Sequence, residues 1–369
     1  MNLVEVKRRS ELKKFLDVPK AIYDPKVYPK YVHPLKLHVR SMLGNLDSNN
    51  RKLFFAYDDT GLLGRIGFKI HKKNGLERLH FGFFECRPDR TDVSAALINA
   101  GRKAFPEYEV MGPFHFRVED PYVGVLVEGF DRDPFFLMSY NPPEYDHLLK
   151  SAGLGPAMDL FTYQVENGAS IVASEAIREN SELATSSGVS IRCLDKKELR
   201  AEAYRIARIF NDALSNNWGF EEFLQDQVNE MVSLLKFFVD PRVVSFAIKD
   251  GKEVGCLIML PNYNRLIKTS RGGLGPRLLW NFLTKRNQIS EARGYALGVL
   301  KSHHGLGIGS LLTRDMALRG YECGYISAEI SWVLSNNGPM KELSKAMGGK
   351  HNKVYRIYKG GPNLEPISS

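Results

Sequence analysis

An internal repeat limits the possible folds of this chain more than any other feature. Segments 55–64 and 246–255 share Phe-Ala, an Asp and a final Gly at matching positions, and each is typical of a strand, an Asp/Gly turn and a second strand. Segments 148–153 and 343–348 share Leu, Lys and Gly at matching positions, and a tyrosine in a β-like run follows each Gly. The two segments of this pair are nearly as far apart in the chain as the two segments of the first pair. Two matches in the same order predict a tandem of two related lobes.

Length and composition agree with two ordinary globular cores. The chain has 369 residues, with 43% hydrophobic and 25% charged side chains. Its apolar stretches are too short to span a bilayer, and its N-terminus does not have the pattern of a secretory signal. The four cysteines are too scattered for a metal-binding pair, which indicates reduced thiols, a cytoplasmic protein and no metal.

The net charge of +9 raises the question of an anionic partner. The basic residues are dispersed along the chain, which favours a solvated basic surface. Neither zinc-finger spacing nor a helix-turn-helix pattern supports nucleic-acid binding, so we expect no nucleic-acid partner.

A glycine-rich turn marks the second lobe. An apolar run, 295–300, leads into His304-Gly-Leu-Gly-Ile-Gly-Ser310, and a helical segment continues to Arg319. A strand that enters a helix through glycines directs free backbone N–H groups and the positive end of the helix dipole at one small volume, which suits a phosphate. The spacing fits neither a dinucleotide fingerprint nor a nucleoside triphosphate loop.

The elements after this turn add a recognisable order. We expect a strand over 325–334, a turn over 335–339, a helix over 340–347 and a closing strand over 354–358. Strand, glycine loop, helix, strand, helix, strand resembles the second half of the GCN5-related N-acetyltransferase (GNAT) fold, and His304 stands where that superfamily has Gln or Arg.

Longer blocks extend the resemblance over nearly the whole chain. The chain is similar to a family of bacterial tandem acetyltransferase-fold proteins, some of which are linked to ceramide synthesis. The blocks that carry the resemblance are 64–66, 81–85, 112–114, 127–131, 140–143, 217–220, 329–334 and 353–358.

The resemblance implies an α/β fold of two tandem lobes, each a mixed, mostly antiparallel sheet flanked by helices. We expect a degenerate N-terminal lobe without a glycine loop at 1–166, a linker at 167–187, and a C-terminal lobe with the acyl-coenzyme A site at 188–369. The turn at 86–92, between an expected strand at 80–85 and an expected helix at 93–105, contains two aspartates and no glycine, so a diphosphate there would meet Cβ atoms and negative charge. We therefore predict one coenzyme site.

In this family the co-substrate is acetyl-CoA or a longer acyl-CoA. Backbone donors for the developing oxyanion come from the strand before the glycine loop. The coenzyme-binding residues implied by the resemblance are Val299, Leu300, His304, Gly305, Leu306, Gly307, Ile308, Gly309, Ser310 and Asn337.

Transfer of an acyl group to an amine needs a base, because the amine is protonated at neutral pH. We choose Glu329, in the middle of a strand where an apolar neighbourhood is expected to raise its pKa; the alternative is a glutamate paired with arginine. The superfamily's usual tyrosine acid falls on Ser344, a poorer acid. Tyr355 is a further proton donor or an ordinary core tyrosine.

Substrate-binding residues are expected on both lobes: Tyr140, Asn141, Trp218 and Trp332. Three functions remain open. The favoured one is an acyl-CoA-dependent N-acyltransferase that transfers an acetyl or longer acyl group to an amine. The second is a long-chain N-acyltransferase acting on a membrane lipid base, with peripheral membrane contact. The third is a non-catalytic binding protein, and the oligomeric state is not predicted.

Overall fold

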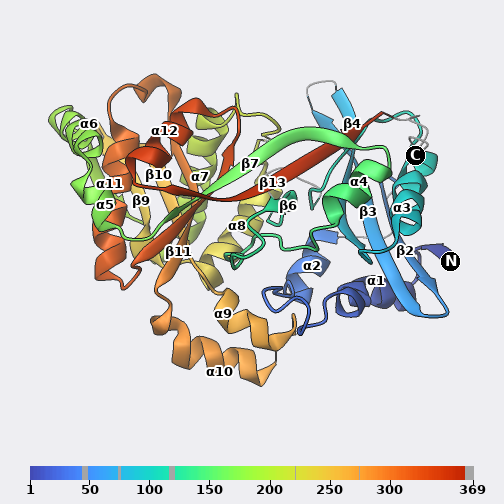
Figure 1. Cartoon of the computed structure of the whole chain (residues 1–369). Coiled ribbons are helices and arrows are strands. Elements are labelled where there is room, and N and C mark those ends of the chain that lie inside the picture. Colours follow the sequence, from blue (N-terminus) through green and yellow to red (C-terminus); the bar gives the residue numbers. More distant parts are fainter. Residues whose placement is uncertain (44–48, 74–75, 116–120, 221, 274, 362–369) are drawn as a thin grey trace. The chain divides into compact units, whose positions relative to one another are not determined.

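The chain divides into two compact units in the computed structural model (Figure 1). Unit 1 comprises residues 1–160, 264–281 and 353–369, and unit 2 comprises residues 161–263 and 282–352. The structure describes residues 1–43, 49–73, 76–115, 121–220, 222–273 and 275–361. Both units combine helices with a mixed, mostly antiparallel sheet, which confirms the expected fold class.

Unit 1 has the strand order β1-β2-β3-β4-β5-β13, and β6 pairs with β13. Its strands are β1 (Asn2–Glu5), β2 (Arg51–Asp58), β3 (Gly61–Lys73), β4 (Leu76–Cys86), β5 (Val110–Gly112) and β6 (Val125–Glu128). Its helices are α1 (Arg9–Ile22), α2 (Lys36–Leu43), α3 (Thr91–Ala104), α4 (Tyr145–Ser151) and α9 (Asn264–Ile267). Helix α10 (Pro276–Lys285) begins in unit 1.

Unit 2 has the strand order β7-β12-β11-β10-β9-β8. Its strands are β8 (Ser190–Cys193), β9 (Val244–Lys249), β10 (Lys252–Pro261), β11 (Glu291–Val299) and β12 (Ser327–Leu334). Its helices are α5 (Ala169–Ala173), α6 (Glu175–Ser186), α7 (Leu199–Ala213), α8 (Gln225–Phe238), α11 (Ile308–Glu322) and α12 (Gly338–Ala346). Segment 167–187, for which the sequence predicts a linker, thus carries α5 and α6.

The internal repeat has a structural counterpart in two hairpins. In the β2–β3 hairpin Ala56 pairs with Gly64, and in the β9–β10 hairpin Ala247 pairs with Gly255. Each hairpin shifts register by a β-bulge next to this pair. The two hairpins thus share an alanine–glycine pair beside a bulge, which agrees with two related lobes.

The last strand of each repeat contributes residues to both units. Strand β7 (Gly155–Val165) runs from unit 1 into unit 2, and β13 (Lys350–Gly360) runs from unit 2 into unit 1. The division into compact units therefore does not follow chain order.

Helix α11 positions the glycine turn of unit 2. Ile308, Leu312 and Met316 recur every fourth residue, are nearly fully buried, and pack in the same core as Val254 and Leu257 of β10. This apolar stripe fixes the first turn of α11 against the sheet. Among the helices that the structure describes, none has both the length and the apolar character needed to cross a membrane.

Candidate functional site

The candidate site begins where strands β11 and β12 separate. The two strands pair in parallel from Glu291 with Ser327 up to Gly294 with Ile330, and the recorded pairing stops there. Both strands continue beyond this point, to Val299 and Leu334 respectively. A parallel pair that opens in this way leaves backbone groups of both strands without their sheet partners.

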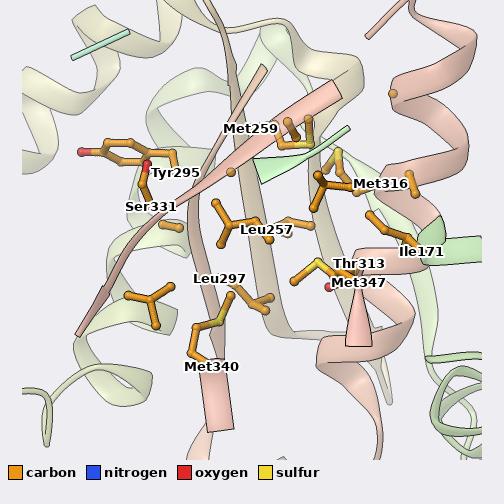
Figure 2. Close-up of a pocket in the computed structure, with 18 of the residues that line it drawn as sticks. Ile171, Leu257, Met259, Tyr295, Leu297, Thr313, Met316, Ser331, Met340 and Met347 are labelled. Carbon is orange, nitrogen blue, oxygen red and sulfur yellow. The ribbon is translucent and has the colours of Figure 1, made fainter. Parts of the chain in front are cut away.

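A cavity of about 220 Å³ lies at this opening in unit 2. Figure 2 shows side chains of α5, β10, β11, α11 and α12 around it. The lining is mostly apolar, and methionines, which are flexible enough to fit ligands of varied shape, make up a large part of it. Its larger apolar side chains are Val165, Ile171, Leu214, Leu257, Met259, Leu297, Met316, Ile326, Ile330, Trp332, Val333, Met340 and Met347.

The backbone of β11 presents hydrogen-bonding groups toward β12. The Leu300 N–H donates to the Val254 carbonyl at 2.8 Å, so Val299 and Gly255 are a non-hydrogen-bonded pair of the β10–β11 ladder. By alternation, the N–H and C=O groups of Val299 and Leu297 point away from β10, toward the side of β12. Of the two predicted oxyanion donors, Val299 is oriented toward the opening and Leu300 is already engaged.

The glycine turn after β11 is accessible, with unused backbone donors. Gly305 and Gly307 adopt left-handed conformations with φ of 81° and 70°, which glycine tolerates without strain. Among the described residues, no hydrogen bond is recorded for the N–H groups of residues 305–310. His304 and Gly305 are exposed, and Ile308 is the buried member of this segment. The turn therefore has the geometry of an anion site at a helix N-terminus.

The three glycines of the turn have different local surroundings. A Cβ at Gly307 would lie 2.0 Å from the carbonyl oxygen of Asn180 in α6, so this glycine is required by packing within unit 2. A Cβ at Gly305 would meet no atom within 4 Å, and one at Gly309 would meet only Leu297 at 3.9 Å. The space in front of Gly305 and Gly309 is thus open to a ligand.

The end of α7 anchors the start of the turn. The Lys301 N–H donates to the Asp212 carboxylate at 2.7 Å, and the Lys301 ammonium donates to the Ser215 hydroxyl at 2.5 Å. The His304 Nε2 lies 3.0 Å from the Val299 carbonyl oxygen. His304 therefore contacts the backbone at the edge of the opening between β11 and β12.

Helix α12 contributes Asn337 and Ser344 in different ways. Asn337 lines the cavity, and its side-chain oxygen caps α12 by accepting from the Met340 N–H at 3.1 Å. Ser344 is fully buried, its hydroxyl donates to the Met340 carbonyl at 2.8 Å, and it does not line the cavity.

Glu329 is a fully buried carboxylate in the middle of β12. Its Oε2 accepts a hydrogen bond of 2.5 Å from the Asn352 side chain. The residues on either side of it along the same strand face, Ser327 and Ser331, line the cavity, whereas Glu329 does not. Glu329 thus lies beside the cavity and is closed off from it.

Arg293 is a buried residue of this site that sequence reasoning missed. It is the register partner of Glu329, and its guanidinium donates to the Ser331 hydroxyl at 2.8 Å. The same guanidinium lies over the ring of Trp332, 4.3 Å from the ring centroid, and Trp332 lines the cavity. An arginine within the otherwise uncharged segment 292–299 was the available sequence signal.

Three predicted residues belong to unit 1. The Tyr355 hydroxyl donates to the Ser139 carbonyl at 3.1 Å, and the Tyr140 hydroxyl donates to the Phe130 carbonyl at 3.3 Å. Asn141 accepts from the Leu126 N–H at 2.7 Å and donates to the Leu126 carbonyl at 3.1 Å, so its amide acts as a backbone partner for β6. In unit 2, Trp218 is half-buried after α7, next to Asn217, which lines the cavity.

The corresponding place in unit 1 is closed. Strands β4 and β5 also pair in parallel. Unlike β11 and β12, the two segments remain hydrogen-bonded to each other beyond this pairing, because the Phe114 N–H donates to the Phe81 carbonyl at 2.7 Å. A Cβ at Gly82 would lie 1.7 Å from the Phe114 carbonyl oxygen. The turn before α3 holds an ion pair between Arg90 and Asp92 at 2.8 Å. Among the described residues of unit 1, these contacts close the place that corresponds to the opening between β11 and β12.

Curated proteins provide two relatives of nearly full length. The chain is 30% identical to the bacterial ceramide synthase of Caulobacter vibrioides, over 97% of each chain. It is 26% identical to protein YghO of Escherichia coli, over 95% of this chain and 93% of that one. The scan against family models gave no match.

Solved structures with GNAT folds cover the whole chain. A glucosamine N-acetyltransferase region of a fungal multi-domain β-N-acetylglucosaminidase matches with a TM-score of 0.59 and 13% identity, over 97% of this chain and 38% of the fungal one. A GCN5-related N-acetyltransferase from Sphaerobacter thermophilus matches with a TM-score of 0.52 and 12% identity, over 98% and 96%. A tandem GNAT protein of the clavulanic acid pathway matches with a TM-score of 0.50 and 12% identity, over 99% of each chain. These likenesses confirm the tandem GNAT fold.

Proposed function

We propose that this chain, a member of the tandem-lobe family of GNAT-fold acyltransferases that includes the Caulobacter ceramide synthase, transfers a long-chain acyl group to a lipid amine. Family membership makes the chain an acyl-CoA-dependent N-acyltransferase, as the sequence predicts. The length of the acyl chain, the lipid nature of the acceptor and the roles of individual residues are the proposal.

The coenzyme diphosphate is proposed to bind at residues 305–310. The support is the set of backbone N–H groups without a recorded protein partner at the start of α11, together with the helix dipole. Arg314, one turn further along α11, adds a half-buried cation, and its Nε has no hydrogen-bond partner among the described residues. Lys301 and His304 add polar groups at the start of the turn.

The single observation that carries the donor proposal is the apolar cavity where β11 leaves β12. Its volume of about 220 Å³ exceeds the ~150 Å³ of an apolar cavity that admits benzene. An acetyl group has far fewer heavy atoms than such a space accepts, whereas an alkyl chain would bury its methylenes against Leu257, Met316 and Met347 at ~0.8 kcal/mol each.

The reaction is attack of the neutral acceptor nitrogen on the thioester carbonyl carbon. The C–N bond forms, the C–S bond breaks, the thiolate leaves, and the extra proton on nitrogen passes to a base. The Val299 and Leu297 N–H groups, directed toward the opening, are the proposed donors to the oxyanion, a role in which one donor is typically worth ~3 kcal/mol. Glu329 is the proposed base, reached through Ser327 or Ser331 or through water, because hydrogen bonds of catalytic groups often tighten only when substrate is bound.

Ser344 occupies the position of the superfamily's usual tyrosine acid, and this position is its only support as the group that protonates the leaving thiolate. Its hydroxyl is committed to the Met340 carbonyl, and the leaving thiolate is weakly basic, so departure does not depend on Ser344. The lipid acceptor is supported by the relative from Caulobacter, a bacterial ceramide synthase. Asn337 and Trp332 line the cavity and are the proposed contacts of the coenzyme and the acceptor.

Thiol release with matched pairs of substrates tests the proposal. Purified protein is assayed with acetyl-CoA and with palmitoyl-CoA, each against a long-chain 2-amino alcohol and against a short one. We expect release only with the long donor and the long acceptor, and mass spectrometry of the untreated protein should reveal a co-purified long-chain thioester. Equal rates with acetyl-CoA and a short amine would contradict the long-chain proposal and leave an ordinary small-amine acyltransferase.

A further inference from the structure

Helix α10 carries an apolar face that is open to solvent. Leu279, Trp280 and Leu283 are 63%, 65% and 74% exposed, and their i, i+1, i+4 spacing puts them on one side of the helix. Large apolar side chains grouped on one exposed face are unusual for a surface and indicate a partner.

The opposite side of α10 is fixed within unit 1. Leu278 and Asn281 are buried. The Asn281 side chain donates to the Leu266 carbonyl of α9 at 3.3 Å and to the Thr269 hydroxyl at 3.2 Å. The apolar face is therefore held outward by contacts on its back.

The surroundings of this face are strongly basic. Segment 264–290 contains six Lys and Arg residues and no Asp or Glu. Five of these cations are exposed: Arg265, Lys268, Arg271, Arg277 and Lys285. The last four make no ion pair with a residue that the structure describes.

We propose that α10, with these four cations, docks on an anionic lipid bilayer and lies in its interface. Leucine and tryptophan on one face with cations around them suit the boundary between headgroups and acyl chains, where tryptophan is enriched. Basic side chains near such a surface gain from its negative potential. This surface is separate from the acyl-CoA site, so the inference does not depend on the proposed reaction.

A second copy of the chain fits this face less well. Two α10 surfaces brought together would oppose eight exposed cations without an acid between them, in a chain whose net charge is already +9. An anionic surface neutralises these charges as it covers the leucines.

Vesicle co-sedimentation of the full chain without substrate tests the proposal. The vesicles are pure phosphatidylcholine, or phosphatidylcholine mixed with phosphatidylglycerol, at about 0.1 M and about 0.5 M salt. We expect binding to the anionic vesicles at low salt and loss of binding at high salt. Changing Leu279 and Leu283 together to Ser should weaken partitioning about ten-fold or more, and each of Arg277→Gln and Lys285→Gln about five-fold.

Control variants distinguish binding through the α10 face from non-specific adsorption to vesicles. Leu183→Ser removes an exposed leucine on α6 and should leave partitioning unchanged. Equal binding of wild type and the α10 variants, or sedimentation with neutral vesicles alone, would overturn the inference. So would light scattering that shows wild type as a dimer and the leucine variant as a monomer, because the face would then join two copies. Acyl transfer to a detergent-solubilised acceptor is measured separately, so that a failure of docking and a failure of the reaction are distinguished.

Discussion

Gly294 of β11 and Ile330 of β12 form the last recorded pair of the parallel β11–β12 ladder, and both residues line the cavity that opens there. One edge of β11 is thereby freed beside an apolar space, and the turn that follows β11 offers six N–H groups without a recorded partner among the described residues. Strand β11 thus borders an apolar cavity and leads into a turn whose backbone donors are unused among the described residues.

Chain-length selectivity should depend on the cavity wall. Met316→Phe adds bulk to a lining residue of α11, so we expect kcat/KM for palmitoyl-CoA to fall about ten-fold relative to a short acyl-CoA. Met316→Leu conserves volume and serves as the control. An unchanged chain-length profile in the Phe variant would place the acyl chain elsewhere.

Glu329 should matter for proton transfer rather than for folding. Glu329→Gln retains an oxygen that accepts from Asn352, so the melting temperature should change little, while kcat falls about 10²–10⁴-fold and the acidic limb of the pH–rate profile disappears. Glu342→Gln, an exposed change on α12, is the matched control. Retention of both kcat and the pH profile would make Glu329 a positioning partner of Arg293 and Asn352.

Two glycines of the same turn should tolerate alanine to different extents. Gly307→Ala combines a left-handed conformation with a Cβ at 2.0 Å from a backbone carbonyl, and it should cost about 2–5 kcal/mol of unfolding free energy. Gly305→Ala has the conformational cost alone, about 1–2 kcal/mol. Denaturant unfolding measures both, and equal losses would refute the packing of Gly307 on Asn180.

Buried histidine should make unit 1 sensitive to acid. Burial lowers the pKa of His115 to about 3, whereas an unfolded chain has a histidine pKa of about 6.5. Between these values the unfolded state takes up a proton that the folded state does not, so stability is lost as pH falls through this window and is recovered as pH rises. His115→Phe should make the dependence of the melting temperature on pH between about 6.5 and 4 shallower but not flat, because His33, His38 and His80 of unit 1 also have lowered pKa values. His147→Gln on the surface should leave it unchanged. A steep dependence that persists in His115→Phe would assign the effect to other groups.

Sequence patterns predicted more of the fold than of the candidate site. The strands and helices after residue 290 were predicted nearly where they lie, because their apolar periods are clear and glycines lie at or just after the ends of α11, α12 and β13. The role of Asn141 could not be inferred, since its hydrogen-bond partner Leu126 is distant in sequence. The contact of Arg293 with Trp332 and the exposed apolar face of α10 could not be predicted either, because burial and exposure depend on the tertiary structure. The packing role of Gly307 was likewise not visible in the sequence, because the Asn180 carbonyl that its Cβ would meet lies in α6.

Coenzyme A affinity of Gly309 variants tests the central claim most directly. Gly309 lies in the first turn of α11 with open space before it, and an Asp there is favourable to the helix, so the fold should be kept. Gly309→Asn has nearly the same shape without the charge, which makes it the matched control. By calorimetry we expect Gly309→Asp to weaken coenzyme A binding at least about 100-fold, through repulsion between unit charges of about 4 kcal/mol at 4 Å, and Gly309→Asn to weaken it far less. Equal affinity of the Asp and Asn variants would contradict a diphosphate held at the start of α11.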